Sequence, residues 1–197
     1  MAYEGVLELA LRLPPADRLR LANVLRGAAE VKLALAWSDL VAFEQARSLP
    51  SEPGVYAILF DVPAGIQMVR IGATRDGSAR PADYRRAPFV LEPRLRVAFC
   101  AVPAAFRENI GALLNAGFPQ HLVDLDWLEY RMERCLLDAY ERRSKKKMLP
   151  PGNFQRGSRR RYLDHVVIEE GPGLRVLDLA PAELPEAVLD GLRQSRR

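Results

Sequence analysis

The chain has 197 residues, of which 49% are hydrophobic and 27% charged, so a substantial packed core is expected and wholesale disorder is not. No apolar run reaches the roughly 18 residues of a membrane helix, and the first residues lack the basic region of a secretory signal. Cys100 and Cys135 have no CxxC spacing, and His121 and His165 have no cysteine pair nearby, which excludes a zinc motif. We therefore expect a cytoplasmic protein with free thiols and no membrane partner.

Positive charge is concentrated in one part of the chain. Residues 1–50 are neutral and residues 162–197 carry a net charge of −3, whereas residues 51–161 carry +7. Within that middle part, residues 142–161 hold nine Lys or Arg and no acid. A block of this kind is typical of a surface that binds phosphate backbones, although a solvated polar loop has the same composition.

Residues 1–50 are predicted to form an N-terminal helical extension. Apolar residues recur at helical spacing before Pro14-Pro15, Asp17 can cap a second helix, and a third is expected over 31–46. Pro50 to Pro53 then marks a boundary. Two roles stay open for these helices: pairing two copies in a homodimer, or packing on the chain's own core.

From residue 51 the pattern changes to that of a mixed domain, predicted to span 51–161. Residues 54–60 and 66–71 are two β-rich runs joined by a short Gly/Pro loop, which predicts a hairpin. A short helix near 79–86, a third strand over 95–102 and helices near 104–116 and 124–143 follow. Residues 162–197 are expected to pack on the same domain as a hairpin, over 162–169 and 174–179, and a helix over 183–193. The class is α+β, with a small three-stranded sheet flanked by helices.

Five short motifs in this order give the chain a resemblance to the GIY-YIG nuclease superfamily. They are PGVY at 53–56, VRIGAT at 69–74, Arg80 with Tyr84 one helical turn later, a helix with Glu133 followed by two leucines, and PPGN at 150–153. The resemblance covers roughly residues 51–155. It implies a sheet with flanking helices and a metal-dependent nuclease that cuts DNA.

The resemblance also implies a role for each matching residue. Tyr56 would activate the attacking water, and Arg80 would clamp the scissile phosphate. Glu133 would bind one divalent ion, Mg²⁺ or Mn²⁺, which polarises the phosphate. Tyr84 and Asn153 match residues that complete and support the site.

Two features depart from the family pattern. Arg70 replaces the first tyrosine of the YIG motif, and an arginine cannot accept a proton. It could instead supply the positive charge that lowers the pKa of Tyr56, or it could mark a degenerate site. The metal-binding carboxylate also has an alternative, because Glu141 lies twelve residues before Asn153; Glu133 is preferred for its helical context. The family pattern does not require the insertion at 103–125.

The leading hypothesis is a restriction- or phage-defence-like DNA endonuclease. The alternative is a catalytically degenerate module that binds nucleic acid or another protein. In either case, basic residues would contact the phosphate backbone, and the candidates are Arg85, Arg86, Arg142, Arg143, Lys145, Lys146, Lys147, Arg156, Arg159, Arg160 and Arg161.

Overall fold

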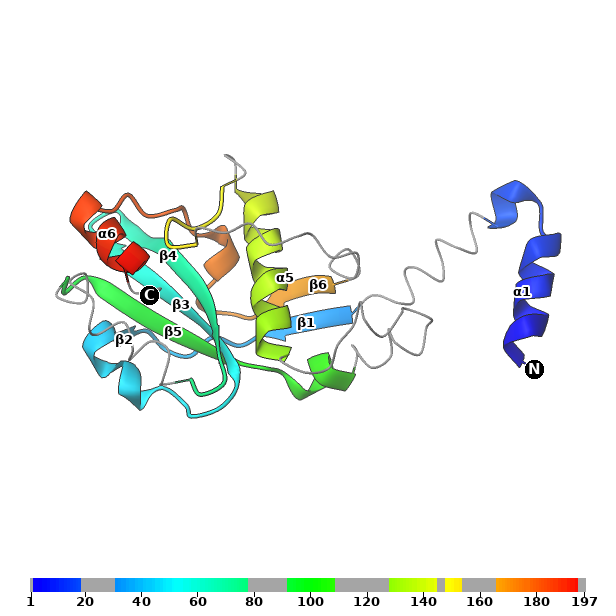
Figure 1. Cartoon of the computed structure of the whole chain (residues 1–197), viewed down its shortest axis with the longest axis horizontal. Helices are drawn as coiled ribbons and strands as arrows, with labels where there is room; N and C mark the ends of the chain where they lie inside the picture. The colour runs from blue at the N-terminus through cyan, green and yellow to red at the C-terminus, as the bar shows by residue number, and fades with distance from the viewer. Residues whose placement is uncertain are drawn as a thin grey trace.

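The computed structural model describes residues 2–18, 31–77, 92–108, 128–144, 148–153 and 166–194. It confirms the α+β class (Figure 1). Helix α1 (Ala2–Arg12) matches the first predicted helix, and residues 15–18 are helical as well. No helix in the described parts of the chain is long and apolar enough to cross a membrane.

The main sheet has four antiparallel strands in the order β2-β5-β3-β4, one more than predicted. They are β2 (Val41–Ala42), β5 (Leu95–Ala101), β3 (Gly54–Val62) and β4 (Gly65–Thr74). The predicted hairpin is confirmed as β3 and β4. Gly65, which begins β4, has a φ of 121°, a conformation that a side chain disfavours. The additional strand, β2, is only two residues long and pairs with β5.

The register of the hairpin decides which side chains share a face of the sheet. Tyr56 lies opposite Gly72, and Ile58 lies opposite Arg70; the pairing then shifts by one residue between Ile58 and Leu59, where β4 bulges. Because directly opposed residues point to the same side, Tyr56 and Arg70 belong to one face. Their chain neighbours Val55 and Ile71 belong to the other face.

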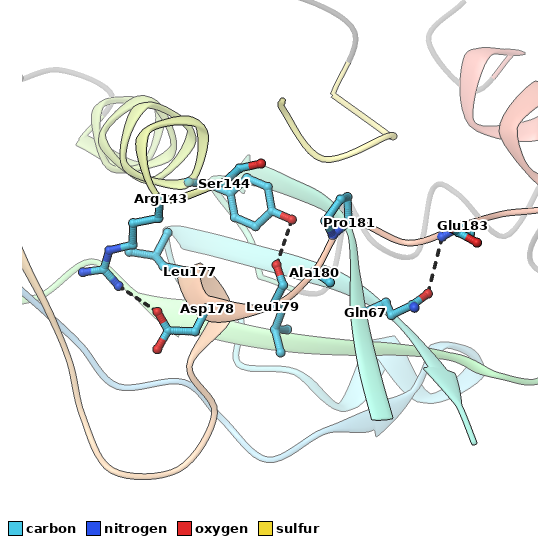
Figure 2. Close-up of a pocket in the computed structure, with 10 residues that line it drawn as sticks. Gln67, Arg143, Ser144, Leu177, Asp178, Leu179, Ala180, Pro181 and Glu183 are labelled. Atoms are coloured by element: carbon cyan, nitrogen blue, oxygen red, sulfur yellow. Dashed lines mark hydrogen bonds and ion pairs between the residues drawn. The ribbon is translucent and has the colours of Figure 1, made fainter. Parts of the chain in front are cut away.

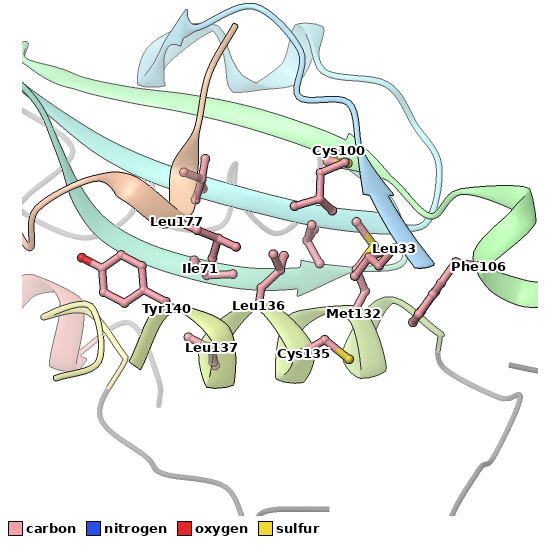
Figure 3. Close-up of a cluster of buried hydrophobic side chains, with 14 of the residues drawn as sticks. Leu33, Ile71, Cys100, Phe106, Met132, Cys135, Leu136, Leu137, Tyr140 and Leu177 are labelled. Atoms are coloured by element: carbon pink, nitrogen blue, oxygen red, sulfur yellow. The ribbon is translucent and has the colours of Figure 1, made fainter. Parts of the chain in front are cut away.

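Helix α5 (Leu128–Arg143) covers the face that carries Val55 and Ile71. Its apolar residues recur every three or four positions, so they form one stripe that packs on the sheet. Met132 and Leu136 in this stripe are fully buried, and Figure 3 shows them directed at the strands. This side of the sheet holds the larger core.

The opposite face holds a second apolar cluster, to which Tyr56 belongs. The 3-10 helix η1 (Phe43–Ser48) contributes Phe43 and Ala46, and the segment leading into helix α6 (Glu186–Gln194) contributes Ala182. Helix α6 agrees with the predicted C-terminal helix. The sheet is therefore covered on both faces, and Tyr56 lies inside the smaller core.

Two predictions about the ends of the chain are wrong. Residues 31–46 do not form a third helix: β1 (Val31–Leu35) is a strand and pairs in parallel with β6 (Val166–Glu170) (Figure 1). The predicted C-terminal hairpin is absent for the same reason, since the partner of β6 is β1. Within 174–179 the chain forms the 3-10 helix η5 (Val176–Asp178) instead of a strand.

Candidate functional site

The outer edge of β4 is closed by two segments that come from much later in the chain. Gly152 donates its backbone N–H to the Val69 carbonyl at 2.7 Å. Further along the strand, Met68 donates to the Ala180 carbonyl and Ala182 donates to Met68, each at 2.8 Å. These bonds satisfy backbone groups that an edge strand would otherwise expose. They bring the predicted PPGN motif against the RIG motif.

Asn153 makes the closest connection between those two motifs. Its side-chain Oδ1 accepts the Ile71 N–H at 2.9 Å, and its Nδ2 donates to the Ile71 carbonyl at 2.7 Å. The side-chain amide thus pairs with both backbone groups of one residue, as a neighbouring strand would. Asn153 is buried, and its own N–H donates to the Pro150 carbonyl at 2.8 Å. Asn153 therefore fixes residues 150–153 beside Arg70 and Gly72.

An Asn153→Ala variant is expected to lose about 2–4 kcal/mol of unfolding free energy, because it leaves the buried N–H and carbonyl of Ile71 without these bonds. Urea unfolding measures the loss. Gln67→Ala is the matched control, since among the described residues Gln67 accepts one long bond, from the Glu183 N–H at 3.4 Å, and its loss should cost less than about 0.5 kcal/mol. Equal losses in the two variants would contradict the assigned role of Asn153.

Tyr56 lies across the hairpin with its ring over Gly72. A Cβ placed on Gly72 would collide with Cζ and Oη of that ring, so only glycine fits there. The collision also shows that the tyrosine hydroxyl lies above β4, the outermost strand. Tyr56 is 1% exposed. The side chain is therefore directed toward the β4 edge from the face opposite α5.

Arg70 is a buried arginine on the same face as Tyr56. Its side chain is held against the PPGN segment, where Nη1 donates to the Gly152 carbonyl at 3.0 Å. A Cβ on Gly152 would lie 2.9 Å from the Arg70 Cβ, so the glycine permits this close approach. Arg70 and Tyr56 are diagonal neighbours on the sheet, a separation that long side chains can bridge. The RIG arginine therefore shares a sheet face with the tyrosine, and its guanidinium lies at the Gly152 carbonyl.

Glu133 lies on α5, which covers the other face of the sheet. It is partly exposed, and it lies one helical turn after Glu129, which the sequence reasoning missed. Glu129 is 5% exposed and forms an ion pair with Arg75, its Oε1 lying 3.5 Å from Nε. Since residues i and i+4 share one flank of a helix, Glu133 lies on the flank that faces the end of β4. The signal available in the sequence was the spacing of two glutamates beside buried Leu128 and Met132.

Several predicted residues lie outside the described residues, so their roles stay predictions. Among those that are described, Arg142 and Arg143 at the end of α5 each contact carboxylates. Arg142 lies 2.5 Å from Asp138, and Arg143 lies 3.3 Å from Asp178. The undescribed ones are Arg80, Tyr84, Arg85, Arg86, Lys145, Lys146, Lys147, Arg156, Arg159, Arg160 and Arg161.

A pocket of about 520 Å³ opens beside the end of α5 (Figure 2). Tyr140 and Arg143 from the helix form one wall, and the segment from Leu177 to Pro181 forms the other. The Tyr140 hydroxyl donates to the Leu179 carbonyl at 2.9 Å, and burial raises the pKa of this tyrosine to about 12. Its hydroxyl is therefore a structural donor at neutral pH.

Glu170 is a buried carboxylate behind this pocket. Its side chain is 1% exposed, with Oε2 3.6 Å from Arg143, and its Oε1 accepts the Leu177 N–H at 3.1 Å. Burial raises the pKa of Glu170 above its ordinary value, although the Leu177 bond and Arg143 oppose the shift. Because the folded state holds the proton more tightly, this group favours folding most at acidic pH and loses that contribution as pH rises through its folded pKa.

A Glu170→Gln variant is expected to be more stable than the wild type at pH 7 by on the order of 1 kcal/mol, since it removes a buried charge and keeps an acceptor for Leu177. The difference should shrink as the pH falls toward 4. Urea unfolding at pH 4, 5.5 and 7 measures it. Glu169→Gln is the control, because Glu169 is exposed and pairs with Lys32. A difference that is constant with pH would refute the assignment.

The described residues form no multi-ligand cage for a metal ion. They contain no group of three or more His, Cys, Asp or Glu side chains that could hold a metal. Mg²⁺ commonly binds through one or two carboxylates and keeps several waters. Glu133 is a partly exposed carboxylate that would supply one such ligand, with substrate phosphates and water as the others.

Comparison of the chain with protein-family models, curated proteins and solved structures finds no match.

Proposed function

We propose that the protein is a metal-dependent endonuclease that hydrolyses DNA phosphodiester bonds in a restriction- or phage-defence-like role. The observation that carries the proposal is the contact between two motifs about eighty residues apart. Asn153 of PPGN bonds to the backbone of Ile71 in RIG. Tyr56 of PGVY lies over the adjacent Gly72. Three of the five motifs thus meet at the edge of β4.

The chemistry assigned to this edge begins with the tyrosine. A tyrosine has an ordinary pKa of about 10, so it needs a nearby positive charge to accept a proton from water at neutral pH. Arg70 shares a sheet face with Tyr56 and remains charged at any accessible pH. In this proposal Arg70 lowers the pKa of the Tyr56 hydroxyl and takes no proton itself.

The remaining roles concern the phosphate. Arg80 would hold its non-bridging oxygens, which match the planar guanidinium donors. Glu133, on the flank of α5 that faces the end of β4, would hold the divalent ion. That ion, when bound, supplies positive charge to the phosphate and to the leaving oxygen. Asn153 acts on Ile71 and keeps the RIG strand in place.

A second candidate function is a module of the same architecture that binds nucleic acid without cutting it. Two observations favour it: Tyr56 is 1% exposed, and the Arg70 guanidinium donates to the Gly152 carbonyl within the fold. Both side chains would then be structural. Its basic surface would still contact phosphates.

Incubation of the full chain with supercoiled plasmid separates the two functions. The endonuclease should nick or linearise the plasmid with Mg²⁺ or Mn²⁺ and should be inactive in EDTA. A gel-shift assay in EDTA measures binding on the same preparation. Binding without cleavage under either ion would favour the second function. A parallel assay on single-stranded RNA tests whether the protein acts on DNA or on RNA.

A further inference from the structure

An exposed arginine and a buried glutamate form an ion pair where β4 ends. Arg75 is the first residue after β4, and its Nε lies 3.5 Å from Oε1 of Glu129 in the first turn of α5. The two side chains differ sharply in exposure, at 57% for Arg75 and 6% for Glu129. The carboxylate is thus anchored in the protein and the guanidinium reaches the surface.

The backbone that carries Arg75 is also held in place. The Thr74 hydroxyl accepts the Asp76 N–H at 3.2 Å and bonds to the Asp76 carbonyl, which closes a tight turn around Arg75. Two residues further on, Gly77 packs so closely that an added Cβ would collide with the Pro50 carbonyl and lie 2.9 Å from the Phe99 ring. Close contacts therefore hold the chain on both sides of Arg75.

Burying the Glu129 carboxylate has an energetic cost that an exposed ion pair avoids, because its charge loses water. Two features offset this cost: the first turn of a helix favours negative charge, and Arg75 supplies the opposite charge. An exposed pair usually contributes little to stability and leaves its arginine flexible. Here the carboxylate is buried, so its position is set by the packing of α5, and the exposed guanidinium lies beside it.

That position is beside the candidate site. Thr74 pairs with Gly54, so Arg75 lies at the same end of the hairpin as Tyr56 and Gly72. Its partner Glu129 lies one turn before Glu133 on the same flank of α5. A guanidinium has five donors in a planar arrangement that matches phosphate oxygens.

We propose that Arg75 binds a backbone phosphate of the nucleic acid next to the cleavage site, with Glu129 as the positioning residue that holds it. The inference rests on the proposed function for the location of the nucleic acid. It requires binding at this surface and does not require cleavage. Neither residue belongs to the motifs that suggested the function.

Binding of the full chain to a fluorescein-labelled DNA duplex, followed by anisotropy in EDTA at several salt concentrations, tests the proposal. Arg75→Ala should weaken binding about tenfold and reduce the slope of log affinity against log salt by about 0.9, the change for one lost phosphate contact. Arg75→Lys should restore part of the affinity, because it keeps the charge. Glu129→Gln should weaken binding less, and adding it to Arg75→Ala should cause no further loss.

Arg94→Ala is the matched control. Arg94 is 48% exposed and pairs with Glu92 at 2.6 Å, and its guanidinium stacks over Phe60, six residues along β3 from Gly54. At about 3.3 Å per residue, this places it roughly 20 Å along the strand from the proposed contact. Its removal should leave affinity and salt slope within twofold of the wild type.

The outcomes of this experiment separate the proposed Arg75 phosphate contact from the proposed nuclease function. Equal binding by Arg75→Ala and Arg94→Ala, with both variants folded by thermal unfolding, would overturn the phosphate contact and leave the nuclease proposal standing. Binding that depends on Arg75 in a protein that cuts no DNA would support the contact and reject the nuclease. A wild-type chain that binds no DNA would overturn both. If Glu129→Gln unfolds, Arg75→Ala and Arg75→Lys decide the result alone.

Discussion

Gly72→Ala is expected to lower the free energy of unfolding by about 2–3 kcal/mol, the upper part of the range for forcing extra carbon atoms into a filled core. The new Cβ would meet Cζ and Oη of Tyr56, and that ring is 1% exposed and cannot swing into solvent. The strand or the ring must shift, so DNA cleavage should fall together with stability. Urea unfolding gives the first quantity and plasmid nicking gives the second.

A double-mutant cycle tests whether the Tyr56 ring causes the loss of stability in Gly72→Ala. A Tyr56→Ala background removes the three atoms nearest to the added Cβ, so Gly72→Ala should cost less than about 0.5 kcal/mol there. Gly5→Ala is the control for glycine substitution itself, because an added Cβ on that residue of α1 meets no described atom within 4 Å apart from its chain neighbours and its own helix backbone. An equal cost in both Tyr56 backgrounds would mean that the ring does not restrict Gly72.

Glu133→Gln is expected to reduce metal-dependent cleavage at least about 100-fold, since a neutral amide is a poor ligand for a hard cation. A 100-fold loss corresponds to about 2.7 kcal/mol of transition-state stabilisation. DNA binding in EDTA should be unchanged or slightly tighter, because a negative charge is removed. The measurement is the initial rate of plasmid nicking at saturating Mg²⁺.

Glu141→Gln is the matched control, and it also tests Glu141 as the alternative metal-binding carboxylate. Glu141 lies two turns later on α5, directly before Arg142 and Arg143, which contact carboxylates. The variant should retain cleavage within a few fold of the wild type. Loss of cleavage in Glu141→Gln and not in Glu133→Gln would move the metal to the end of the helix.

The parts of the fold that could be predicted from the sequence are those formed by nearby residues. The β3–β4 hairpin needs only two β-rich runs and the loop that joins them, and α5 has an apolar stripe along its length. The pairing of β1 with β6 joins residues more than 130 positions apart. Val31, Leu33 and Leu35 alternate with exposed residues, a strand pattern that is too short to distinguish from a helix without its partner.

The candidate site also has residues that could be predicted from the sequence and contacts that could not. Tyr56, Arg70 and Asn153 could be named because their motifs are short, ordered and recognisable. The hydrogen bonds from the Asn153 side chain to the backbone of Ile71 could not be predicted. They depend on β4 lying at the edge of the sheet, where its backbone groups are open to a side chain. The four-residue spacing of Glu129 and Glu133 is visible in the sequence, but the burial of Glu129 and its ion pair with Arg75 depend on how α5 packs against the end of β4.

The most direct test of the proposed nuclease site compares the wild type with a Tyr56→Phe/Glu133→Gln double variant, purified in parallel and incubated with supercoiled plasmid and Mg²⁺. Tyr130→Phe/Glu141→Gln is the matched control, since Tyr130 is an exposed tyrosine on α5. The wild type and the control should cut the plasmid, and EDTA should stop them, while the double variant stays folded and leaves the plasmid intact. Cleavage by the double variant at the wild-type rate would contradict the assignment of the site.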